Sequence, residues 1–102
     1  MIATYIMDCL KSQKMIVFSW GFNSPVALKN GLQFSVIGFI HKGIVQVIYN
    51  EGLDLFEVNT LKNGNVIKSK ADVYIDELVD VIDLMVEKVD NYDERVKREY
   101  QM

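Results

Sequence analysis

Apolar residues recur at helical spacing near both ends of the chain. Residues 2–10 (IATYIMDCL) place their isoleucines, cysteine and leucine on one face, which predicts a short amphipathic helix. Towards the C-terminus, six apolar residues recur at steps of four, three, four, three and four. They are Leu78, Ile82, Met85, Val89, Tyr92 and Val96. This stripe predicts a long amphipathic helix over residues 77–100, with Asp76 as its N-cap.

Between these helices, runs of β-branched and aromatic residues alternate with turn-forming sequences. The run MIVFSW, residues 15–20, predicts the first strand. Four further runs are bounded by turn-prone sequences that end in Gly31, Gly43, Gly52 and Gly64. Short connections of this kind favour an antiparallel meander.

The segment SPVALKNG predicts a short helix between the first strand and the meander. Ser24 can cap this helix, Pro25 suits its first turn, and Gly31 can end it in the left-handed conformation. The predicted fold is a single α+β domain, residues 1–102. It has an N-terminal helix, a five-stranded, mostly antiparallel meander sheet with a short inserted helix, and a long C-terminal amphipathic helix packed on one sheet face.

Length and composition agree with one compact domain. The chain has 102 residues, half of them hydrophobic, which is enough to bury a core. No apolar run approaches the roughly 18 residues that span a bilayer, so no membrane association is expected. The single cysteine, Cys9, cannot form an internal disulfide, and this favours a reducing, cytoplasmic location.

The net charge of −3 is distributed unevenly. Residues 76–94 hold eight acidic residues against Lys88 alone. Six of the acids form a row on the predicted C-terminal helix: Asp76, Asp80, Asp83, Glu87, Asp90 and Glu94. The row is interpreted first as a solvated helix face and second as a docking surface for a basic protein. Weak binding of a divalent metal or general acid–base catalysis is the least favoured interpretation, because a convex solvated helix offers no cleft. Nucleic acid is not an expected partner, because a phosphate backbone requires a clustered basic surface.

Residues that carry chemistry are few. Cys9 and His41 are the only cysteine and histidine, so a thiol nucleophile and its base would have to be this pair. Cys9 falls on the apolar helix face, and His41 lies in a turn where we expect it to be exposed. No phosphate-binding glycine motif, zinc-ligand spacing or calcium loop is present, so no metal and no cofactor are expected.

Two groups of apolar residues are candidates for binding. Trp20 and Phe22 either cover an open end of the sheet or form an aromatic clamp, which together with Tyr49 would line a pocket between helix and sheet. The sheet face away from the helices is expected to present four apolar residues, Ile37, Phe39, Ile44 and Ile48. They lie among the polar residues Gln33, Ser35, His41 and Gln46. Such a face suits a homodimer, unless the sheet curls around its own core and exposes little.

Three segments carry a resemblance to other proteins. SWGF at residues 19–22, the stretch from ALKNG to LFEV at 27–58, and VIDLMVEKVD at 81–90 together resemble a group of small bacterial single-domain proteins of unassigned function. The resemblance covers nearly the whole chain. It implies a compact bacterial protein and brings with it no activity and no site residues.

Two functional hypotheses follow. The first is a non-catalytic protein-interaction module that forms a homodimer or binds another protein through Asp80, Asp83, Glu87, Asp90, Glu94, Ile37 and Phe39. The second is a small-ligand-binding or enzymatic domain that uses Trp20, Phe22 and Tyr49. The first is preferred, since the sequence holds no nucleophile pair, metal cage or phosphate loop that would carry catalysis.

Overall fold

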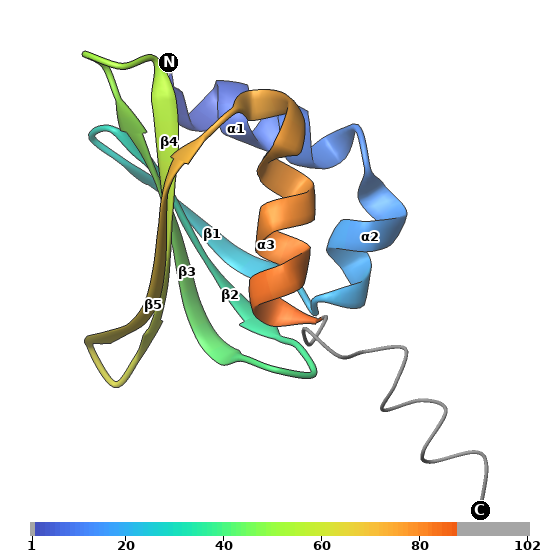
Figure 1. Ribbon diagram of the computed structural model, residues 1–102. Coiled ribbons are helices and arrows are strands. Elements are labelled where there is room, and N and C mark those ends of the chain that lie inside the picture. Colours follow the sequence, from blue (N-terminus) through green and yellow to red (C-terminus); the bar gives the residue numbers. More distant parts are fainter. Residues whose placement is uncertain (1, 88–102) are drawn as a thin grey trace, which may run out of the picture.

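The computed structural model describes residues 2–87 as a twisted sheet with helices on one side (Figure 1). The five strands follow the order β1-β2-β3-β4-β5, and each is antiparallel to its neighbours. The predicted α+β class and five-stranded antiparallel meander are therefore confirmed. The elements are α1 (Ile2–Lys11), α2 (Lys14–Ser19), β1 (Asn23–Leu28), β2 (Gly31–Ile37), β3 (Lys42–Asn50), β4 (Leu55–Lys62), β5 (Asn65–Val73), the 3-10 helix η1 (Ile75–Glu77) and α3 (Leu78–Val86).

The first strand and the inserted helix were predicted in the wrong places. Residues 14–19 form α2, whereas β1, which begins at Asn23, covers residues 24–28 of the segment predicted to be helical. A six-residue apolar run fits a strand or a buried helix turn equally well, so its composition did not decide between them. In β1, Pro25 lies on an edge strand, where its missing N–H removes no bond from the centre of the sheet.

Gly31 is part of β2 and does not end a helix. Leu28 pairs with Gly31, so Lys29 and Asn30 form a two-residue hairpin turn. A Cβ atom at Gly31 would overlap the carbonyl oxygen of Val47 on the neighbouring strand. The glycine is therefore required by the close approach of two backbones.

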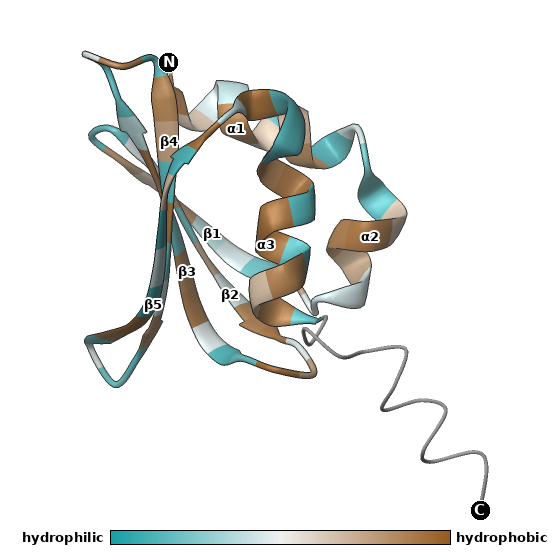
Figure 2. Cartoon of the chain, viewed as in Figure 1, coloured by the Kyte–Doolittle hydropathy of each residue, from teal (hydrophilic) through white to brown (hydrophobic). Residues whose placement is uncertain are grey.

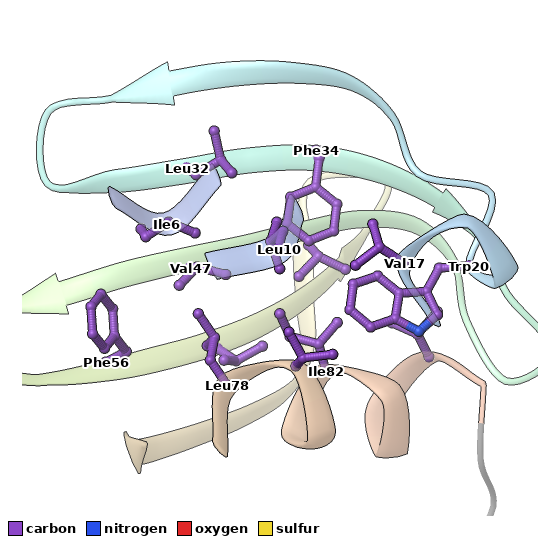
Figure 3. Close-up of a cluster of buried hydrophobic side chains, with 14 of the residues drawn as sticks. Ile6, Leu10, Val17, Trp20, Leu32, Phe34, Val47, Phe56, Leu78 and Ile82 are labelled. Atoms are coloured by element: carbon purple, nitrogen blue, oxygen red, sulfur yellow. The ribbon is translucent and has the colours of Figure 1, made fainter. Parts of the chain in front are cut away.

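The core lies between the inner face of the sheet and the helices (Figure 3). Leu32 and Phe34 of β2 alternate with half-buried polar residues, as expected for a strand with one face against a core. Ile6 from α1 and both Leu78 and Ile82 from α3 are fully buried in the same cluster. Hydrophobic and hydrophilic residues alternate along α3, as Figure 2 shows, which fits a helix with one buried face.

The start of α3 differs from the prediction. Residues 75–77 form η1, and Glu77, not Asp76, holds the N-cap position of α3. The carboxylate of Glu77 accepts a hydrogen bond from the backbone N–H of Tyr74 at 3.0 Å. The last described turn of α3 ends at Val86. Residues 88–100 of the predicted helix lie outside the described residues.

The loop between β2 and β3 meets the C-terminal end of α3. The carbonyl oxygen of Val86 accepts hydrogen bonds from the N–H groups of Ile40 at 2.8 Å and His41 at 3.2 Å. A helix end leaves such carbonyls without partners inside the helix, and here the loop supplies them. Gly38 is buried against the same turn, so the loop and the helix end hold each other in place.

Among residues 2–87, no helix is long and apolar enough to cross a lipid bilayer.

Candidate interaction surfaces

Trp20 is a structural residue of the core. Its side chain is fully buried, and its Nε1–H donates a hydrogen bond to Asp83 Oδ1 at 2.9 Å. The indole lies nearly parallel to the ring of Phe34, with 6.4 Å between centroids. Phe22 is half-buried, and its ring centroid is 4.7 Å from that of Phe34. Of the two interpretations of this segment, the geometry fits the one in which the aromatic rings cover the sheet.

Tyr49 lies near the other end of the sheet. The carbonyl oxygen of Trp20 accepts a hydrogen bond from Ile37 at one end of β2, whereas Tyr49 N–H donates to Asn30 in the turn before the other end. The seven residues of β2 separate these points by about 20 Å. Tyr49 hydroxyl donates to Asp54 Oδ1 at 2.6 Å, and this bond raises the pKa of Tyr49. The structure thus does not bring Trp20, Phe22 and Tyr49 into one pocket.

The predicted acidic row is partly used inside the fold. Asp80 is exposed, but Asp83 binds Trp20 and Glu87 Oε1 accepts a hydrogen bond from Phe39 N–H at 2.8 Å. Two of these three carboxylates therefore connect α3 to other elements. Asp90 and Glu94 lie outside the described residues.

Cys9 and His41 each have a structural role. The Cys9 thiol lies 3.6 Å from the carbonyl oxygen of Ile75, and burial raises the pKa of Cys9. His41 is 6% exposed, so the expectation of an exposed turn residue is wrong; its Nε2 lies 3.1 Å from the carbonyl oxygen of Ile44. The backbone of residues 38–41 bonds to the end of α3, and the imidazole lies against Gly43 and Ile44 at the start of β3. Within residues 2–87, no group of three or more potential metal ligands is present.

The Cys9 thiol is expected to react slowly with an aromatic disulfide reagent in the native protein. The thiolate is the reactive form, and the raised pKa reduces its population at neutral pH. The pKa of the thiol is lower in the unfolded chain than in the folded protein, so the unfolded chain loses the thiol proton at lower pH. The contribution of Cys9 to stability is therefore complete below its ordinary pKa and falls as pH rises above that value. Thiol release measured by absorbance, in buffer and in denaturant, tests this. Equal rates in both conditions would contradict it.

The sheet face away from the helices carries a row of polar side chains. Strand register places Gln33 beside Gln46, Gln46 beside Asn59, and Asn59 beside Ser69. We call these four residues the polar row. Gln46 Nε2 donates to Gln33 Oε1 at 2.9 Å, and Asn59 Nδ2 donates to Glu57 Oε2 at 3.1 Å. Because Gln33 and Gln46 alternate with buried residues of the core face, they point to the opposite side, the outer face.

Aliphatic side chains flank the polar row. Ile44 pairs with Leu61 on one side of it, and Ile48 pairs with Glu57 on the other; all four are half-buried. Glu57 is the only charged residue among these flanking positions and the polar row. Within residues 2–87 all three α-helices lie on the other side of the sheet (Figure 1). Within the same residues the two edge strands, β1 and β5, are not paired with each other, so the sheet does not close into a barrel.

Ile37 and Phe39 are exposed at one end of the sheet. Their side chains are 63% and 64% exposed. Ile37 is the last residue of β2, and Phe39 lies in the loop that contacts α3. The two residues thus lie at the margin of the outer face.

A groove between α1 and α2 was not anticipated. Its volume is about 420 Å³, and its apolar lining comes from both helices and the segment after them. The lining residues are Met7, Leu10, Val17, Phe18 and Phe22, with Lys11 and Lys14. The assignment of residues 15–20 to a strand concealed this groove, since helical spacing is what brings Val17 and Phe18 beside α1.

Comparison of the chain with protein-family models, with curated proteins and with solved structures finds no match. The surfaces are therefore interpreted from their own chemistry.

Proposed function

We propose that this protein is a non-catalytic interaction module that associates with a second copy of itself through the outer face. The observation that carries the proposal is the composition of that face: amides, hydroxyls and aliphatic side chains, with Glu57 as its one carboxylate at the positions described. One of the eight positions described is charged, against 25% of the chain as a whole, and Lys42 lies at the margin, paired with Ile37. Depletion of charge distinguishes the centre of protein interfaces from other surface.

A second copy is the partner that the polar row fits best. Each amide has both a donor and an acceptor, so a row of amides is complementary to the same row turned by a twofold rotation. In such a pair, half-buried Gln33 and Gln46 would find partners for the groups they do not already use. Asn59 is only 9% exposed and already donates to Glu57 Oε2, so it contributes less. The flanking Ile44, Leu61 and Ile48 would lose their remaining contact with water.

The dimensions of the face indicate a weak dimer. Five strands and seven paired residues cover about 20 Å by 20 Å. This footprint of about 400 Å² is roughly half of the 800 Å² of accessible surface that each partner of a stable interface typically buries. We therefore expect dissociation constants in the micromolar range.

We propose no catalytic role because the side chains that could carry chemistry are engaged in structural contacts. Cys9 and His41 each contact a backbone carbonyl, and Asp83 and Glu87 hold α3 to its neighbours. A bacterial, cytoplasmic setting is part of the proposal and is supported by the single cysteine and by the resemblance described above. Self-association through the acidic helix, at exposed Asp80, is the alternative that the following experiment separates.

The substitution Gln46→Lys is expected to weaken self-association by at least about tenfold. A twofold axis near the middle of the polar row would bring the two introduced ammonium groups together, and like charges facing each other are destabilising. Sedimentation equilibrium from low to high micromolar concentration measures the dissociation constant. Thermal unfolding of the variant shows whether the fold is intact.

Two control variants keep this test specific. Thr4→Lys adds the same charge at an exposed position of α1, and Asp80→Lys reverses a charge on α3; both are expected to leave association unchanged. A wild-type protein that is monomeric at high micromolar concentration would overturn the proposal. Loss of association in Asp80→Lys but not in Gln46→Lys would assign the interface to the acidic helix instead.

A further inference from the structure

The groove between α1 and α2 combines an apolar lining with two cations. Five of the seven lining residues are apolar, and Leu10 and Val17 among them belong to the buried core. Its volume of about 420 Å³ lies in the range of small-molecule sites. The only polar side chains in the lining are the two lysines, Lys11 and Lys14.

The two lysines lie where α1 gives way to α2. Lys11 is the last residue of α1 and Lys14 is the first of α2. A neighbouring depression shares both lysines and adds Ser12 and Gln13 from the connecting turn. Cations at the end of α1 are also favoured by the helix dipole. The groove therefore has one cationic, hydrogen-bonding end.

The apolar residues around the groove are more exposed than the fold requires. Phe18 is 71% exposed and Met15, beside it on α2, is 84% exposed. Hydrophobic residues follow one another along α2 (Figure 2), although its six residues bury only Val17. A contiguous apolar surface with a polar rim is typical of a ligand groove.

We propose that this groove binds a free single-chain anionic amphiphile, such as a fatty-acid carboxylate. The hydrocarbon chain lies along Phe18 and Phe22, where it loses its contact with water, and the carboxylate binds Lys11 and Lys14. The aliphatic parts of the lysine side chains can cover the hydrocarbon chain of the ligand while their ammonium groups remain at the surface. Neither lysine forms an ion pair with a carboxylate of residues 2–87, so both are available to the ligand.

The site is separate from the outer face. The groove is lined by residues of α1 and α2. Both helices lie on the side of the sheet opposite to the outer face (Figure 1). Binding of an amphiphile and self-association can therefore succeed or fail independently, and Gln46→Lys is expected to leave binding intact.

Calorimetric titration with dodecanoate, kept below its micelle concentration, tests the proposal. Saturable binding of one molecule per chain is expected. The double variant Lys11→Glu/Lys14→Glu is expected to weaken it by about tenfold or more, since both attractive charges become repulsive. The matched control Lys29→Glu/Lys62→Glu makes the same change in net charge at exposed hairpin positions and is expected to bind as the wild type. Phe18→Ala, which truncates an exposed side chain, is expected to weaken binding without unfolding the protein.

Three results would overturn the proposal. The first is no saturable binding of dodecanoate. The second is equal affinity for dodecanoate and for a cationic amphiphile with the same chain, which would remove the role of the lysines. The third is binding to anionic phospholipid vesicles without binding to monomeric dodecanoate, which would make the apolar helix surface a membrane contact.

Discussion

Replacing Trp20 with alanine is expected to lower the free energy of unfolding by about 3–5 kcal/mol. The indole is fully buried between α3 and the sheet, and truncation leaves a cavity as well as an Asp83 carboxylate without this donor. Domains of this size are stable by only about 5–15 kcal/mol, so the variant would be close to unfolding at room temperature. Urea unfolding followed by circular dichroism measures the loss.

A milder series separates packing from hydrogen bonding. Trp20→Phe keeps an aromatic ring but removes the Nε1–H, and Asp83→Asn keeps an oxygen acceptor but removes the charge. Hydrogen bonds to charged groups usually contribute about 1.5–3 kcal/mol, so a double-mutant cycle of the two variants is expected to give a coupling free energy in that range. If Trp20→Ala were as stable as the wild type, the assignment of Trp20 to the core would be wrong.

Gly38→Ala is expected to destabilise the protein by about 2–4 kcal/mol. A Cβ atom at this position would meet Val86 Cγ1 and would lie 2.5 Å from the carbonyl oxygen of Val86. That oxygen accepts the N–H groups of Ile40 and His41, so the methyl group would push the loop away from the end of α3 and weaken both bonds.

Gly52→Ala is the matched control for this substitution. The nearest atom to a Cβ at Gly52 is Asn50 Oδ1, at an ordinary contact distance of 3.6 Å. The change is therefore expected to be neutral, or slightly stabilising through a less flexible unfolded chain. Thermal unfolding resolves the difference, since each kcal/mol corresponds to about 4–8 °C in a domain of this size. Equal melting temperatures for the two variants would show that the loop is not held against α3 as described.

The Trp20 and Gly38 variants both test how α3 is attached to the rest of the domain. Asp83 joins α3 to the segment before β1, and Val86 and Glu87 join it to the loop after β2. The carboxylates that suggested a docking surface are thus part of what positions α3. This is why the proposed interface moves from the acidic helix to the outer face of the sheet.

Much of the candidate site was accessible from residue patterns. The turn-forming glycines and the alternation in β2 and β3 identified a meander, and Gln33 and Gln46 were expected on the outer face. Asn59 and Ser69 were missed because their place in the polar row depends on strand pairing across the sheet. The groove was missed because MIVFSW satisfies the spacing of either a strand or a helix turn.

Local pattern alone determined the class of this protein, α+β, and its antiparallel meander, because hydrophobic periodicity and turn chemistry act over a few residues. The tertiary structure decided three other properties. It placed α2 and β1, it directed Asp83 and Glu87 toward partners distant in the chain, and it buried His41. Each of these depends on contacts between segments 40 or more residues apart or on the competition between two local conformations of similar energy. The spacing of residues along the chain does not indicate such contacts, because they form only when the sheet and helices pack together.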